Sequence, residues 1–104
     1  LSVANYDFKH AWHIYIIKVD IEKLNISRDE FMRRLGDLNI GSGLHYSPVH
    51  LHKYYKDKYF YKHGDLPNTE YCGNRILSLP LFPKMTNKDQ KDVIKAIENI
   101  ISKC

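Results

Sequence analysis

The sequence has few cysteines, no long apolar run and little excess charge. Only Cys72 and Cys104 among its 104 residues are cysteine, which is too few for a disulfide framework and favours a reducing compartment. The longest apolar run, residues 14–17, is far shorter than the roughly 20 residues of a membrane-spanning helix. We therefore expect a cytoplasmic protein that does not enter the membrane.

Several sequence motifs that are typical of catalytic or cofactor-binding sites are also missing. The sequence has no glycine-rich phosphate loop, no HExxH zinc motif, no nucleophile elbow and no kinase signature. His45, His50 and His52 lie within eight positions, but a structural zinc site needs four ligands, usually including cysteine, and this spacing matches no zinc motif. We expect no metal site.

The positive charge is concentrated in one stretch. The net charge is +4, and in residues 52–63 four lysines face a single acid, Asp57. Lysines that alternate with tyrosines can bind single-stranded nucleic acid by stacking and phosphate contact. The total charge is nevertheless below that of a dedicated nucleic-acid binder, so we expect no nucleic-acid partner. A solvated, tyrosine-rich helix is the simpler interpretation, and its tyrosines could also pack against a partner surface.

The first half of the chain predicts one strand and one helix. Residues 11–19 are rich in aromatic and β-branched side chains on both faces, which is typical of a central strand. Ser27 and Glu30 have the spacing of a capping box at the start of a helix. Asn39 is a suitable left-handed residue to end that helix.

The second half predicts short elements and one long helix. We expect a strand over residues 40–46, a helix over 50–59, and a brief helix capped by Asn68 or Thr69 and running through Arg75. A strand over 76–79 and a final helix capped by Thr86 complete the chain. With 43% hydrophobic and 27% charged residues, this order predicts one small α/β domain of the α+β type. Its sheet would be mostly antiparallel, with about three strands, and backed by helices.

The loop over residues 41–50 is the candidate functional segment. It combines two glycines with polar and aromatic groups and ends at Pro48-Val49-His50, and loops on rigid scaffolds often carry functional groups. His45 can exchange a proton near neutral pH, and Tyr46 points to the opposite face of an extended chain. The alternative is that His45 is a satisfied structural residue and Tyr46 a core ring. Local chemistry leaves both interpretations open.

Separated signatures in a fixed order resemble the C-terminal domain of the DegT–StrS family of pyridoxal-phosphate-dependent sugar-nucleotide aminotransferases. Their order and spacing carry the resemblance, which covers residues 11–101 and extends to enzymes that aminate a UDP-linked 4-keto sugar. The signatures are AWHIYII at 11–17, Val19-Asp20, Arg28, Phe31, Leu35, Ile40-Gly41, LHYSPVH at 44–50, Tyr54-Tyr55, DLPNTE at 65–70, ILSLPLFP at 76–83, Met85-Thr86, Val93 and Ile97.

The resemblance implies a homodimeric fold-type I aminotransferase that takes its amino group from glutamate and makes precursors of cell-surface polysaccharides. Residues 1–104 would be one domain, the C-terminal small domain, with residues 1–10 connecting it to a large N-terminal domain. That large domain would carry the Schiff-base lysine and bind pyridoxal 5'-phosphate, so this chain would hold no catalytic or cofactor-binding residue.

The resemblance also assigns a role to the loop. His45 and Tyr46 match the family's loop that reaches the active site, and His50 ends the same segment. All three would contact the nucleotide-sugar substrate, and the neighbouring lysines could hold its diphosphate. Two other functions remain open: a small basic module that binds nucleotide or single-stranded nucleic acid, and a purely structural interaction domain.

Overall fold

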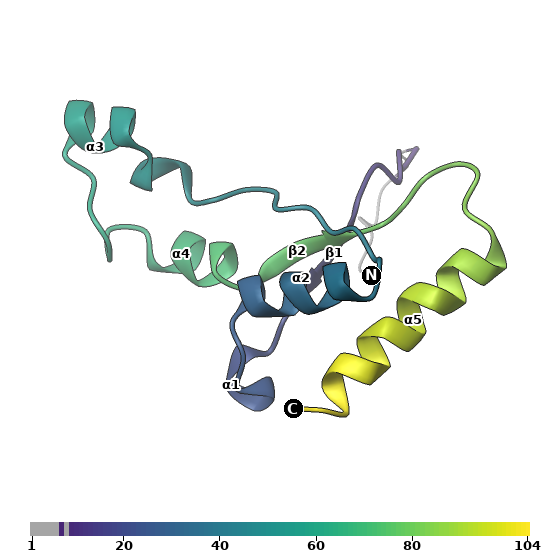
Figure 1. The fold of residues 1–104 in the computed structure, drawn as a ribbon. Coiled ribbons are helices and arrows are strands. Elements are labelled where there is room, and N and C mark those ends of the chain that lie inside the picture. Colours follow the sequence, from purple (N-terminus) through teal and green to yellow (C-terminus); the bar gives the residue numbers. More distant parts are fainter. Residues whose placement is uncertain (1–6, 8) are drawn as a thin grey trace.

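The computed structural model describes residue 7 and residues 9–104. Six helical segments and two strands form this part of the chain (Figure 1). In order they are β1 (Tyr15–Lys18), α1 (Ile21–Leu24), α2 (Arg28–Asp37), the 3-10 helix η1 (Val49–Leu51), α3 (Lys53–Tyr59), α4 (Pro67–Gly73), β2 (Ile76–Leu79) and α5 (Asn87–Ile101). Among the described helices, none has the length and apolar character needed to cross a membrane.

The two strands pair antiparallel and share one core with α2 and α5. Tyr15 lies opposite Leu79, and Ile17 lies opposite Leu77. Because alternate strand residues share a face, Ile17, Leu77 and Leu79 point to the same side of the sheet, where they meet the core. The centre of that core is formed by Val19, Phe31, Leu35, Leu77, Ala96 and Ile100. The predicted α+β domain, an antiparallel sheet backed by helices, is confirmed.

The sheet is smaller than predicted. Within the described residues it has two strands, not about three, and β1 covers only four residues of the expected 11–19. The expected strand over 40–46 is reduced to one bridge, in which the backbones of Gly43 and Ser78 exchange hydrogen bonds of 3.0 and 2.8 Å. The central position predicted for residues 11–19 is wrong, because β2 is the one strand that pairs with β1 among the described residues and Ile16 is 41% exposed. The face of β1 that points away from the core is also apolar, which is why the sequence predicted a central strand. No described element covers that face.

The caps of α2 agree with the sequence in part. The Ser27 hydroxyl accepts a hydrogen bond from the Glu30 N–H (3.1 Å), which confirms the N-cap. The Glu30 carboxylate does not accept the Ser27 N–H, as a capping box would require, and binds Arg33 and Arg34 instead. Asn39 ends the helix with φ +61°, as predicted.

The C-terminal turn of α2 is a Schellman motif. The N–H of Asn39 donates to the Gly36 carbonyl and the N–H of Ile40 to the Leu35 carbonyl, both at 2.9 Å. Ile40 also packs against the core that contains Leu35. The motif therefore satisfies the last carbonyls of α2 and directs the chain into the loop that follows.

The last helix is capped as expected, while the two middle helices differ from prediction. Thr86 and Asp89 form a full capping box at the start of α5. The helix expected over 50–59 is divided into η1 and α3 by an extended residue, His52. α4 starts at Pro67, with Leu66 as its N-cap, and ends at Gly73, so the predicted caps Asn68 and Thr69 and the predicted end at Arg75 are wrong. Proline has the fixed φ and the missing N–H that suit a first helical residue.

Candidate functional site

The candidate loop is fixed to β2 through His45. Nδ1 of His45 lies 2.8 Å from Oγ of Ser78, and Ser78 is only 5% exposed. A Cβ atom at Gly43 would lie 2.7 Å from both Cε1 of His45 and Oγ of Ser78, closer than real contacts allow. Glycine at position 43 is therefore what permits the imidazole to lie against the serine.

The hydrogen bonds around Ser78 connect the loop to β2. The Gly43 carbonyl accepts the Ser78 N–H at 2.8 Å, and the Ser78 hydroxyl lies 3.3 Å from that carbonyl and 2.8 Å from Nδ1 of His45. The hydroxyl donates to Nδ1 or accepts from it according to which ring nitrogen carries the proton. Nε2 makes no hydrogen bond to the described residues, so His45 is held by the scaffold and keeps one ring nitrogen for a ligand.

Tyr46 lies at the surface next to this ring. It is 72% exposed, so the alternative that it is a core residue is wrong. The rings of His45 and Tyr46 meet edge to face, with centroids 5.2 Å apart, and do not diverge to opposite faces. The loop thus presents an imidazole and a phenol side by side.

A second contact fixes the loop to the end of α4. A Cβ atom at Gly73 would lie 2.6 Å from Cγ and 2.8 Å from Cδ of Pro48, so the proline ring packs directly on a glycine backbone. An open groove of about 460 Å³ runs between the loop and α4. Its lining residues are Tyr46, Ser47, Pro48, Val49, Asn68, Thr69, Cys72, Gly73 and Ile76.

A third contact fixes the loop through His50. His50 is 5% exposed, and its Nε2 lies 3.0 Å from Oε1 of Glu70. The hydrogen bond from His50, followed by that from the Gly64 N–H, lowers the pKa of Glu70 to about 2. Since an ionised carboxylate only accepts, Nε2 donates, and Nδ1 of His50 is left buried without a hydrogen-bond partner.

His50 therefore belongs to the scaffold in this structure. The edge of the Tyr61 ring packs on it, with centroids 5.8 Å apart, and His63 lies 3.3 Å from the other oxygen of Glu70. Substrate contact by His50 stays a prediction. The three histidines of the segment do not gather, and the described residues contain no cluster of three or more side chains suited to a metal ion.

Sequence reasoning missed the residues that hold the loop in place. Ser78 and Glu70 stand in segments that carry the family resemblance, and Gly73 lies between those segments, but no local pattern pairs these residues with partners twenty or more positions away. Arg28 was missed in the same way: it is 8% exposed and donates to the carbonyls of Gly73 (3.2 Å) and Ile76 (3.0 Å). A buried arginine that binds carbonyls fixes the turn between α4 and β2, on which the loop rests.

The described lysines do not suit covalent attachment of an aldehyde cofactor. Such a lysine needs a desolvated setting that lowers its pKa. Every lysine that the structure describes is exposed, and Lys53, which lies nearest the loop, has its Nζ 2.5 Å from Asp57.

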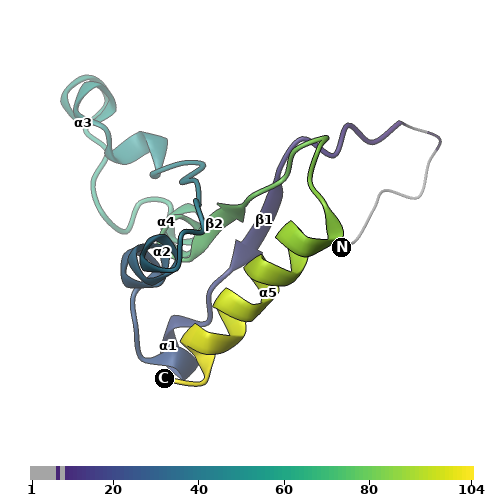
Figure 2. The ribbon, with the colours of Figure 1, turned by 45° about the vertical axis from the view of Figure 1, so that its right-hand side comes forward.

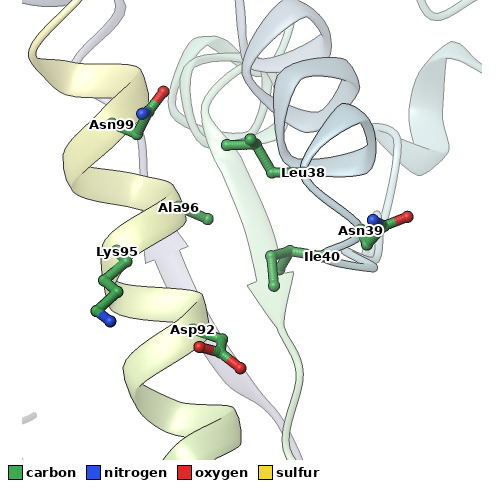
Figure 3. Close-up of a pocket in the computed structure, with 7 residues that line it drawn as sticks. All are labelled: Leu38, Asn39, Ile40, Asp92, Lys95, Ala96 and Asn99. Atoms are coloured by element: carbon green, nitrogen blue, oxygen red, sulfur yellow. The ribbon is translucent and has the colours of Figure 1, made fainter.

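A second hollow, of about 410 Å³, lies between the end of α2 and α5 (Figure 3). Its lining residues are Leu38, Asn39, Ile40, Asp92, Lys95, Ala96 and Asn99. No loop residue reaches it, and its mixed polar and apolar lining points to no particular ligand.

Comparison with known proteins places this geometry in a family. The sequence profile of the DegT/DnrJ/EryC1/StrS aminotransferase family matches residues 2–98. The chain is 44% identical over 96 residues to the spore coat polysaccharide biosynthesis protein SpsC of Bacillus subtilis; the match covers 91% of the chain and 25% of SpsC.

Two solved structures have the same fold. The aminotransferase TlmJ from Streptoalloteichus hindustanus superposes with a TM-score of 0.73 at 25% identity, over 91% of this chain and 24% of that one. A DegT DnrJ EryC1 StrS aminotransferase from Brucella abortus does so with a TM-score of 0.67 at 34% identity, over 86% and 22%. The chain thus spans about a quarter of the length of the relatives it matches.

Proposed function

We propose that this chain, which belongs to the DegT/DnrJ/EryC1/StrS aminotransferase family, is the C-terminal small domain of a pyridoxal-phosphate-dependent sugar-nucleotide aminotransferase. The match to a quarter of longer relatives supports a single domain of a larger enzyme. The exposed lysines support a cofactor that is bound, with its lysine, outside these residues.

The observation that carries the proposal is the fixed His45 ring beside the exposed Tyr46. An imidazole nitrogen without a partner among the described residues and a phenolic hydroxyl are hydrogen-bonding groups suited to the hydroxyl and phosphate oxygens of a sugar nucleotide. Because the ring is oriented before the ligand arrives, little freedom is lost on binding. We assign His45 and Tyr46 to binding and orienting the sugar end of the substrate, and we assign no proton transfer at carbon to them.

The substrate we propose is a UDP-linked 4-keto sugar, with glutamate as amino donor. SpsC is named for spore coat polysaccharide biosynthesis, and its 44% identity supports a related place in making precursors of cell-surface polysaccharides. We further propose a homodimer in the cytoplasm. His50 would support the loop from behind, through Glu70.

An assay of the full-length protein tests this function. UDP-, GDP- and dTDP-linked keto sugars are each supplied with glutamate, and 2-oxoglutarate and the amino sugar are measured. We expect turnover, with the UDP-linked 4-keto sugar preferred. Absence of turnover with every sugar, together with salt-sensitive binding of a single-stranded oligonucleotide, would favour the nucleic-acid module instead.

A further inference from the structure

The segment around α3 stands apart from the core. We call residues 52–66 the arm; in Figures 1 and 2 it extends from the body of the molecule on the side away from α5. α3 contributes no buried residue. The arm contacts η1 and α4 through a few groups: the Tyr61 ring packs on His50, and His63 and the Gly64 N–H lie against Glu70.

The arm exposes large aromatic side chains. Tyr54 is 57% exposed, Tyr59 is 53% exposed and Phe60 is 84% exposed. Tyr55 and Tyr59 stack on each other with centroids 6.1 Å apart, and the Lys58 ammonium donates to the Tyr54 hydroxyl at 2.8 Å. These local contacts order the aromatic surface without covering it. A helix of seven residues is not stable in water on such contacts alone.

Phe60 occupies a position that disfavours it. It ends α3 with φ +60°, in the left-handed region, where glycine or asparagine is the usual residue. A phenylalanine there adds backbone strain and, in this chain, buries almost none of its ring. A contact of the Phe60 ring with a surface outside residues 1–104 would account for both the left-handed backbone and the exposed ring.

The charge of the arm indicates the chemistry of that contact. Lys53 is paired with Asp57, whereas Lys56 and Lys62 have no acidic partner among the described residues. Two arms placed together would bring like charges into contact, which disfavours a second arm as the partner. An apolar hollow rimmed by acidic groups fits both the rings and the lysines.

We propose that the arm docks, through Tyr54, Tyr59 and Phe60, on an apolar, acid-rimmed surface of the same protein that lies outside these 104 residues. This rests on one part of the proposed function, namely that the chain is a quarter of a longer protein. Docking explains why so short a helix keeps exposed rings and an aromatic end residue.

Photo-cross-linking tests the docking directly. In the full-length protein Phe60 is replaced by p-benzoylphenylalanine, and the cross-linked peptide is identified by mass spectrometry. We expect a cross-link to an acidic segment outside residues 1–104, and none from the same probe at Lys91, an exposed position on α5. A cross-link to a second copy of the arm, loss of the cross-link on adding UDP, or no cross-link at all would each overturn the proposal.

Amide exchange gives an independent measurement in the full-length protein. Phe60→Asp should speed exchange across Lys53–Tyr59 by about tenfold or more, because the docked helix would open more often. Lys91→Asp should leave it unchanged. Unchanged exchange in Phe60→Asp contradicts docking. Neither measurement uses activity, so a retained cross-link in a protein without aminotransferase turnover would reject the proposed function and keep the docking.

Discussion

Nδ1 of His45 lies 2.8 Å from the hydroxyl oxygen of Ser78, a residue of β2 that is 5% exposed. The contact joins the candidate loop to β2 and orients the imidazole beside Tyr46. It explains how a loop with two glycines can present a side chain in a fixed direction.

Ser78→Ala should weaken the attachment of His45. It removes the hydroxyl that forms a hydrogen bond with Nδ1 and leaves the backbone bridge to Gly43 intact, so we expect a loss of about 1 kcal/mol in the free energy of unfolding. Urea unfolding of Ser78→Ala, His45→Ala and the double variant measures the coupling. Fully additive losses would mean that the two side chains do not interact.

Gly43→Ala should destabilise the protein by about 1–3 kcal/mol, because its Cβ would meet His45 and Ser78 at 2.7 Å. Gly41→Ala is the matched control two residues earlier, since a Cβ there meets nothing within 4 Å. Thermal or urea unfolding compares the two. Equal stability of the two variants would refute the close packing described at Gly43.

Alanine substitutions at two helical glycines should change the free energy of unfolding in opposite directions. Gly73→Ala places a Cβ 2.6 Å from Pro48 and should lower the free energy of unfolding and move the loop away from α4. Gly36→Ala meets nothing within 4 Å inside α2 and should raise stability by about 0.5–1 kcal/mol, through helix propensity. If Gly73→Ala also stabilised the protein, Pro48 would not pack where the structure places it.

The hydrogen bond between His50 and Glu70 predicts that the protein loses stability in acid. The pKa of Glu70 is lowered from 4.5 to about 2 in the folded protein, so its contribution to stability is full above pH 4.5 and is lost as the pH falls toward 2. Glu70→Gln removes this contribution, and its stability should decline less over that interval. Unfolding curves between pH 5 and pH 2 make the comparison, and parallel declines would show that Glu70 is not the group concerned.

The sequence was most informative where structure depends on neighbouring residues. Helices begin at Ser27 and Thr86 and end at Asn39, as their local chemistry predicts, and β2 has the predicted bounds of 76–79. Local patterns could not show that residues 11–14 and 40–46 would not form strands. An apolar run has the same appearance whether its partner is a strand or another part of a longer protein.

The candidate site was indicated by the composition of the loop and by the family resemblance. Neither could pair residues of the loop with Ser78, Glu70 or Gly73, because those contacts span 20 or more residues. The same long-range contacts decided that Tyr46 lies at the surface and that His50 is buried.

The central claim is that His45 contacts the sugar end of an aminotransferase substrate. The most direct measurement is steady-state kinetics of His45→Ala in the full-length enzyme, with the sugar nucleotide and glutamate varied in turn. We predict that kcat/KM for the sugar nucleotide falls about tenfold, as expected for one lost hydrogen bond to a polar ligand, while kcat/KM for glutamate is unchanged. An unchanged kcat/KM for the sugar nucleotide would contradict the account.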